Sequence, residues 1–171
     1  MKKIILLTAM LFCLCACEST DPPKPSATPE NAVTIALSEN TGEFENMNVY
    51  EDCEHDITKS GDENEKISLL TSAKKDSDGH FMWDDIREWV LLVENEQGIY
   101  PLYNAKNHAT LSMNVSEHYL ENGETEDVIR LTISSSAGYE IREYTFSDGV
   151  FAEKIAYDTG AINELSINKY Y

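Results

Sequence analysis

Basic residues are scarce in this chain. Its 13 lysines and arginines face 31 aspartates and glutamates, which gives a formal net charge of −18 at pH 7. A surface of this charge repels nucleic acid and anionic lipid headgroups. We therefore predict that no nucleic acid is a partner. We favour solubility as the reason for the acidity, with attraction of cations or basic partners as the alternative.

The familiar catalytic motifs are also missing from the sequence. It has no G-x-S-x-G, H-E-x-x-H or C-x-x-C pattern and no glycine-rich phosphate loop. Paired carboxylates of the kind that hydrolyse glycosides cannot be selected among 31 acids without geometry. The sequence therefore favours a protein that is not an enzyme, and it names no catalytic residue.

Cysteine is rare, and three of the four cysteines lie at the end of an N-terminal apolar run. Met1–Lys3 is a short basic start, and Ile4–Cys15 is almost wholly apolar. A span of a bilayer needs about 20 apolar residues, so this run is too short to cross. A basic start followed by a short apolar run is typical of an export signal.

The signal ends in Leu14-Cys15-Ala16-Cys17, which resembles the lipobox of bacterial lipoproteins. The resemblance implies that diacylglycerol alkylates Cys17 and that residues 1–16 are then removed. It also implies a protein held outside the cytoplasm, anchored by its lipid to the cell membrane or the outer membrane. The alternative is an ordinary secretory signal or a poor membrane anchor.

Cys53 would be the one cysteine left beside the lipidated residue, so no disulfide within the mature domain is expected. A lone cysteine is usually a small buried apolar residue. Its acidic neighbours, Glu51, Asp52 and Glu54, should raise the pKa of the thiol and make it unreactive.

Residues 17–31 hold four of the five prolines and few apolar residues, which is typical of a semi-extended tether. Residues 32–171 have the length of one domain. Within them, short β-favouring runs are bounded by turns at roughly 8–12 residue spacing. Turn signals lie at Asn95–Gly98, Ser136–Gly138, Ser147–Gly149 and Asp158–Gly160. The pattern predicts a mainly β domain, an antiparallel sandwich or barrel of about 7–9 strands.

One short helix is expected within this β-rich domain. Ile67, Leu70 and Ala73–Lys74 recur at helical spacing, and Asp62 is available as an N-terminal cap. Pro101, in a strand expected over Ile99–Tyr103, indicates a sheet edge or a bulge.

The first site hypothesis is the acidic stretch Asp76–Asp85, where Asp76, Asp78, Asp84 and Asp85 lie close to Gly79. Calcium takes 6–8 oxygen ligands, and such loops supply carboxylates. The fit to an EF-hand loop is poor, since Lys74 stands where a first carboxylate belongs. We favour a turn, in which Asp and Gly serve the backbone, over a calcium site.

The second site hypothesis is aromatic. Trp83, surrounded by acids, could present a sugar-stacking face, as in carbohydrate-binding modules, whereas Trp89 lies in an apolar run and is expected in the core. The segment Asp84–Tyr103 also resembles, loosely, uncharacterised small lipoproteins, which implies no activity. The sequence thus favours an envelope lipoprotein that binds a partner protein or ligand. The alternative is a glycan-binding or glycan-hydrolysing module at the cell surface.

Overall fold

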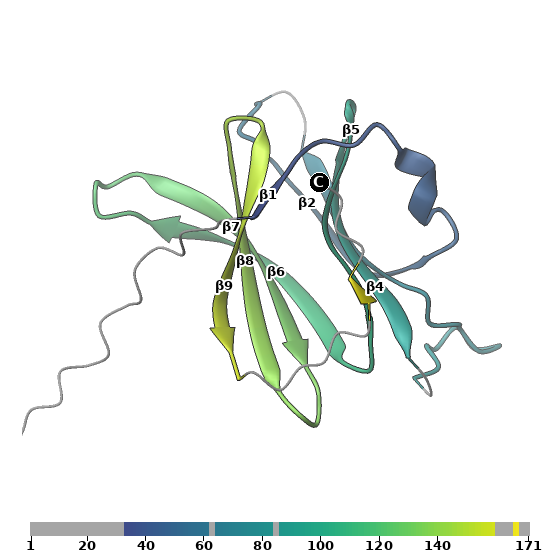
Figure 1. Ribbon diagram of the computed structural model, residues 1–171. Coiled ribbons are helices and arrows are strands. Elements are labelled where there is room, and N and C mark those ends of the chain that lie inside the picture. The colour runs from purple at the N-terminus through teal and green to yellow at the C-terminus, as the bar shows by residue number, and fades with distance from the viewer. Residues whose placement is uncertain (1–32, 62–63, 84–85, 160–165, 168–171) are drawn as a thin grey trace, which may run out of the picture.

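The computed structural model describes residues 33–61, 64–83, 86–159 and 166–167. Within them, ten strands form two antiparallel sheets that lie face to face (Figure 1). Sheet A has the order β1-β9-β8-β7-β6, and sheet B has the order β10-β5-β4-β3-β2. The strands are β1 (Val33–Ile35), β2 (Asn48–His55), β3 (Glu65–Thr71), β4 (Arg87–Asn95), β5 (Gly98–Asn107), β6 (Thr110–Tyr119), β7 (Thr125–Ser134), β8 (Tyr139–Ser147), β9 (Val150–Asp158) and β10 (Ser166–Ile167).

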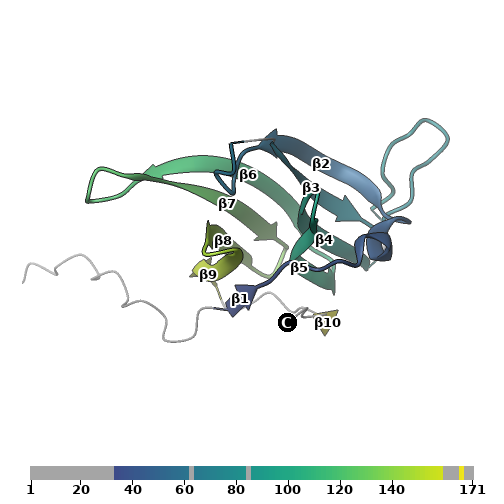
Figure 2. The same ribbon diagram turned by 90° about the horizontal axis from the view of Figure 1, so that it is seen from above.

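This architecture confirms the predicted mainly β, sandwich-like fold. Strands β2 to β5 are successive neighbours in sheet B, and strands β6 to β9 are successive neighbours in sheet A. The chain changes sheet between β5 and β6. The β6–β7 hairpin extends away from the two sheets (Figure 2). Its tip carries Tyr119, which is 82% exposed.

The main core lies between the sheets. Successive side chains of a strand point to opposite faces of its sheet, so every second residue of a strand points into the core. The largest fully buried side chains are Trp89, Tyr144 and Phe151. Trp89 is therefore in the core, as predicted. Its indole Nε1 donates a hydrogen bond to the carbonyl of Ala109 at 3.1 Å.

The helix expected around Ile67–Lys74 is wrong, because this segment forms β3 and the residues that follow it. Ile67 and Leu69 point into the main core. Leu70 points to the opposite side and is also buried, at 8% exposure. A strand covered on both faces loses the apolar–polar alternation, and its apolar residues then imitate helical spacing.

The cover on the outer face of sheet B comes from a short 3-10 helix, η1 (Thr41–Phe44). Phe44 packs with Leu70, Val90 and Ile99 in a second apolar cluster. Strand β2 therefore begins only after η1, at Asn48.

Pro101 lies beside a bulge, as predicted, because the register shifts between Leu91 and Leu92 opposite it. It is not at a sheet edge, since β5 lies between β4 and β10. The predicted turns at Gly98 and Gly149 connect β4 to β5 and β8 to β9, each glycine with positive φ.

The chain crosses from sheet A to sheet B directly after β1. Val33–Ile35 pairs with β9 in sheet A. Three residues later, Ser38 forms an isolated antiparallel bridge with Ile99 of β5, with N–O distances of 2.7 and 2.9 Å. One short segment therefore joins the two sheets at this side.

An ionic cluster lies inside the sandwich. The guanidinium of Arg142 donates to Glu140 on its own strand and to Glu153 on β9, the latter at 2.8 Å. It also lies over the ring of Tyr103 in sheet B, 5.0 Å from the centroid. Buried charges need such partners, because isolated ions in a protein interior are costly.

Candidate functional site

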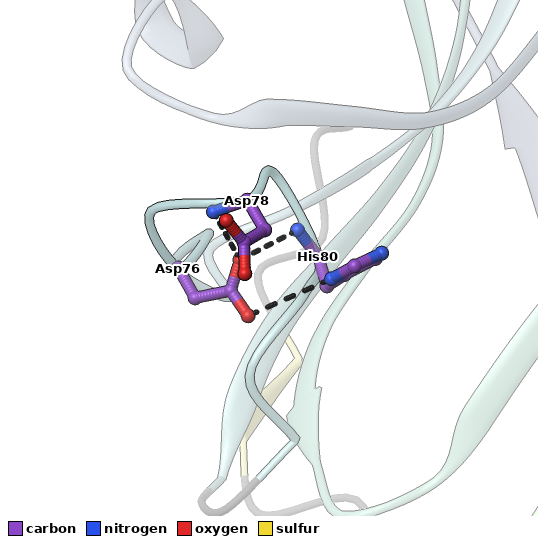
Figure 3. Close-up of side chains that lie close together, drawn as sticks. All are labelled: Asp76, Asp78 and His80. Atoms are coloured by element: carbon purple, nitrogen blue, oxygen red, sulfur yellow. Dashed lines mark hydrogen bonds and ion pairs between the residues drawn. The ribbon is translucent and has the colours of Figure 1, made fainter.

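The predicted acidic loop is a small hairpin after β3, closed by a bridge between Lys75 and Phe81. At its turn, Asp76, Asp78 and His80 place one potential metal-binding atom each within 4.8 Å of one another (Figure 3). All three residues are exposed. One carboxylate oxygen of Asp76 accepts hydrogen bonds from the backbone amides of Asp78 and His80, both at 2.9 Å.

These contacts are those of a side chain that shapes a turn. The other Asp76 oxygen lies 3.7 Å from Nδ1 of His80. Two carboxylates and an imidazole do not provide the oxygen shell that calcium prefers, and suit a transition metal better. The other two residues of the calcium hypothesis, Asp84 and Asp85, lie outside the described residues.

Trp83 belongs to an aromatic cluster at the base of this hairpin. Its ring stacks on Trp89 with centroids 5.9 Å apart and planes inclined by 16°. Tyr50 contacts it edge-on at 5.5 Å, and Phe81 lies 5.2 Å away. The Arg87 guanidinium lies 4.6 Å from the centroid of the Trp83 ring.

Trp83 nevertheless remains 45% exposed. The cluster therefore joins the core tryptophan to the surface, with Trp83 as its outer member. The neighbours of the ring occupy much of the surface that a sugar would stack on, and they hold the indole in a fixed orientation. An exposed part of the ring is left at the boundary with solvent.

A third region is the seam between the two sheets, which we define by β2 on one side and β6 on the other. These strands end their respective sheets. The Glu51 carboxylate spans the seam and accepts a hydrogen bond from the backbone amide of Met113 at 2.9 Å. A cavity of about 420 Å³ opens here, lined by Glu51, Asp52, Cys53, Glu54, His55, Met113, Asn114 and Val115.

Cys53 lies in this seam and is exposed, so the expectation of a buried cysteine is wrong. Partial burial and then the charge of Asp52 raise the pKa of the thiol above its usual value. The predicted direction is therefore confirmed, although burial outweighs the neighbouring acid. A thiol that stays protonated is a poor nucleophile.

At one end of the seam, the buried side chain of Asp127 on β7 forms ion pairs with residues at and after the end of β2. Its carboxylate lies 2.5 Å from Nζ of Lys59 and 3.3 Å from Nε2 of His55. Burial alone would raise the pKa of Asp127, but hydrogen bonds from Lys59 and His55 outweigh it and lower the pKa below its ordinary value. This carboxylate therefore joins sheet A to the chain that follows β2.

A larger cavity of about 720 Å³ lies between the loop after β2, the β4–β5 turn and the β8–β9 turn. The buried Glu65 lines it, but this carboxylate accepts hydrogen bonds from the amide of Ile57 and from Thr58. Burial first, and then the charge of Glu65, raise the pKa of Tyr100 in the same wall. Glu65 thus serves to hold the loop after β2.

Of the predicted site residues, the structure brings Asp76 and Asp78 together and places Trp83 at the base of the same hairpin. Cys17 lies outside the described residues. Sequence reasoning missed His80 as a third potential ligand, although it is only two positions from Asp78. It also missed the seam, because Glu51 and Met113 are 62 residues apart and nothing local links them.

No protein-family model, curated protein or solved structure matches this chain significantly. Among the residues that the structure describes, no helix has the length and apolar character needed to cross a membrane.

Proposed function

We propose that this protein is a lipid-anchored lipoprotein outside the bacterial cytoplasm, where its β-sandwich binds a partner protein or ligand at the cell envelope. The observation that carries the proposal is the Leu14–Cys17 lipobox after a short apolar run. Acyl chains on Cys17 would anchor the chain stably, where a single chain is marginal.

The residues after Cys17 support this arrangement. A proline-rich segment extends by about 3.1 Å per residue, so one from Cys17 to Val33 would let the sandwich work up to roughly 50 Å from the membrane. Removal of residues 1–16 takes away Lys2 and Lys3 and no acid, which leaves 11 basic residues against 31 acids and keeps such a domain away from anionic headgroups. The sandwich would then meet a partner in the envelope instead of lying on the lipid.

A glycan-binding module is the second candidate, and the exposure of Trp83 favours it. An indole held in place by Trp89 and Arg87 and 45% exposed is a rigid apolar surface beside polar groups. A sugar would stack on the part of the ring that these neighbours leave exposed. A glycan array with the purified chain separates the candidates: saturable binding that Trp83→Ala abolishes would favour the glycan module.

The anchor is tested by mass spectrometry of the native chain and by fractionation. We expect the chain to begin at Cys17, to carry acyl chains there, and to sediment with membranes until detergent is added. Cys17→Ser should abolish acylation, and Cys13→Ser, outside the lipobox, should not. Recovery of wild-type chain with residues 1–16 attached and Cys17 unmodified would refute the anchor.

A further inference from the structure

The seam between β2 and β6 is where the sandwich is open. Within the described residues, β2 pairs only with β3 and β6 pairs only with β7. The two strands face each other without backbone pairing, and the side chain of Glu51 bridges them. β2 has eight residues and β6 has ten, whereas the edge strands on the opposite side, β1 and β10, have three and two.

The backbone of β6 presents a regular row of polar groups to the seam. The amide of Met113 points there, since it donates to Glu51 across the seam. β6 pairs with β7 without a register shift. In an antiparallel ladder, the direction of the backbone groups alternates from residue to residue. The amides and carbonyls of Val115 and Glu117 therefore face the seam as well.

The inner wall of the seam is apolar on β6 and mixed on β2, where Glu51 lies opposite the core residue Leu69 of β3. Met113 and Val115 lie opposite Leu131 and Ile129 of β7, and both pack on the main core while only half-buried. Cys53 lies opposite Ile67 of β3, which places the thiol on the inner face of β2. Its exposure shows that the core is uncovered at this point.

The outer rim is acidic. Asp52 and Glu54 lie opposite Ser68 and Lys66 on the outer face of sheet B, and both are exposed. Lys66 is 3.7 Å from Asp52, a distance at which an exposed ion pair contributes little. The rim therefore keeps most of its negative charge available.

We propose that the seam binds an extended, basic segment of a partner protein, which adds to sheet A as a strand beside β6. Strand addition uses backbone groups for affinity and alternate side chains for specificity. Side chains on one face of the added strand would meet Met113 and Val115 of β6 together with Glu51 and Cys53 of β2. Those on the other face would meet Asp52 and Glu54. The matching partner sequence alternates small apolar residues with lysine or arginine.

The Glu51 carboxylate would have to leave the Met113 amide and pair with a basic group of the incoming strand. An acidic strand would be repelled by the same three carboxylates, so the edge selects its partner by charge. This inference refines the proposed function by naming the partner's chemistry. The binding test uses the purified chain in detergent solution and does not depend on membrane attachment. Failure of the lipid anchor and failure of peptide binding at the seam are therefore separate results.

The test uses the purified full chain in a non-ionic detergent and a fluorescein-labelled peptide, TKVKVKT, followed by fluorescence anisotropy. Two control peptides are compared with it. The first, TEVEVET, carries the opposite charge. The second is TKVKVKT with N-methyl groups on both valines and the central lysine, which prevents it from pairing as a strand. The variant Asp52→Asn/Glu54→Gln is compared with Glu94→Gln/Glu96→Gln, which removes two exposed acids elsewhere. Hydrogen exchange reports on the amides of β6.

We expect TKVKVKT alone to bind, with slowed exchange at Val115 and Glu117. Affinity should fall about two- to fivefold for each rim carboxylate removed, and it should not change in the variant of Glu94 and Glu96. Equal binding of the N-methylated peptide would overturn the proposal, because charge alone would then explain it. Absence of binding, or equal affinity for the rim variant, would overturn it too.

Discussion

The backbone carbonyl of Ser38 lies so close to Gly98 that a Cβ atom at position 98 would overlap it. This contact accompanies the bridge between Ser38 and Ile99, where the chain crosses from one sheet to the other. The glycine also has φ +151°, a region that other residues avoid. Gly98 is thus required twice, for the conformation of the β4–β5 turn and for the approach of the crossing segment.

Gly98→Ala should therefore lower the free energy of unfolding by about 2–4 kcal/mol. Gly79→Ala is the matched control, because its φ is +85° and the added Cβ meets nothing within 4 Å. That change should cost only about 1 kcal/mol, the penalty of the left-handed backbone. Urea denaturation measures both values, and equal losses would show that the Ser38 contact is not limiting.

Asp127 should make stability depend on acidity. Because its pKa is lowered in the folded chain, its contribution is present above the unfolded value near 4 and is lost as pH falls through the folded value. Asp127→Asn should cost about 1–2 kcal/mol at pH 7. It should also flatten the fall in unfolding free energy below about pH 4.

The control for this titration is Glu121→Gln, a change at an exposed position of the β6–β7 hairpin. Urea unfolding at pH values from 2 to 7 should give the wild-type profile for this variant. An Asp127→Asn profile parallel to the wild-type profile at low pH would show that another carboxylate carries the acid dependence.

The Asp76–His80 turn should not need calcium. Because the Asp76 side chain holds two backbone amides, Asp76→Ala should cost about 1 kcal/mol with or without the ion. Asp76→Asn keeps an accepting oxygen and should be nearly neutral. Thermal unfolding with calcium and with EGTA should give the same midpoint, and a rise of several degrees with calcium that Asp76→Asn removes would establish the ion site.

Trp83 should contribute to stability although it is partly exposed. Trp83→Ala removes its contacts with Trp89, Tyr50 and Arg87, and should cost about 1–3 kcal/mol. Tyr119→Ala, at an 82% exposed position, should change stability by less than about 0.5 kcal/mol. Equal effects of the two changes would mean that the cluster does not act as a packed unit.

Fluorescence can follow the same cluster directly. Trp89 is fully buried and Trp83 is not, so acrylamide should quench one tryptophan and spare the other. Trp83→Phe should leave emission that acrylamide hardly reduces. Strong quenching of that remaining emission would contradict the burial of Trp89.

The sequence predicted the strand-rich class and several turns because hairpins are local. Glycine at positions 98 and 149 marks a change of direction that the adjoining strands then follow. β3 was misassigned because its outer face is covered by residues from η1, about 25 positions earlier. That cover cannot be read from the spacing of Ile67 and Leu70 alone.

The candidate sites divide in the same way. Asp76 and Asp78 are neighbours in sequence, so their proximity was predictable. The seam depends on which strands end the two sheets, and hence on the whole topology. Glu51 was visible in the sequence only as one acid among many, and Met113 only as an inward residue of a strand.

If the proposed lipid anchor is correct, the segment after β1 affects what a protease would release from the membrane. Since Val33–Ile35 and Ser38 fasten one sheet to the other, a protease that cuts the chain before Val33 leaves this fastening whole. A cut between Ile35 and Ser38 would instead break the covalent link between the β1–β9 pair in sheet A and the Ser38–Ile99 bridge in sheet B. The position of the cut, before Val33 or a few residues after it, would therefore determine whether the released fragment keeps this connection between its sheets.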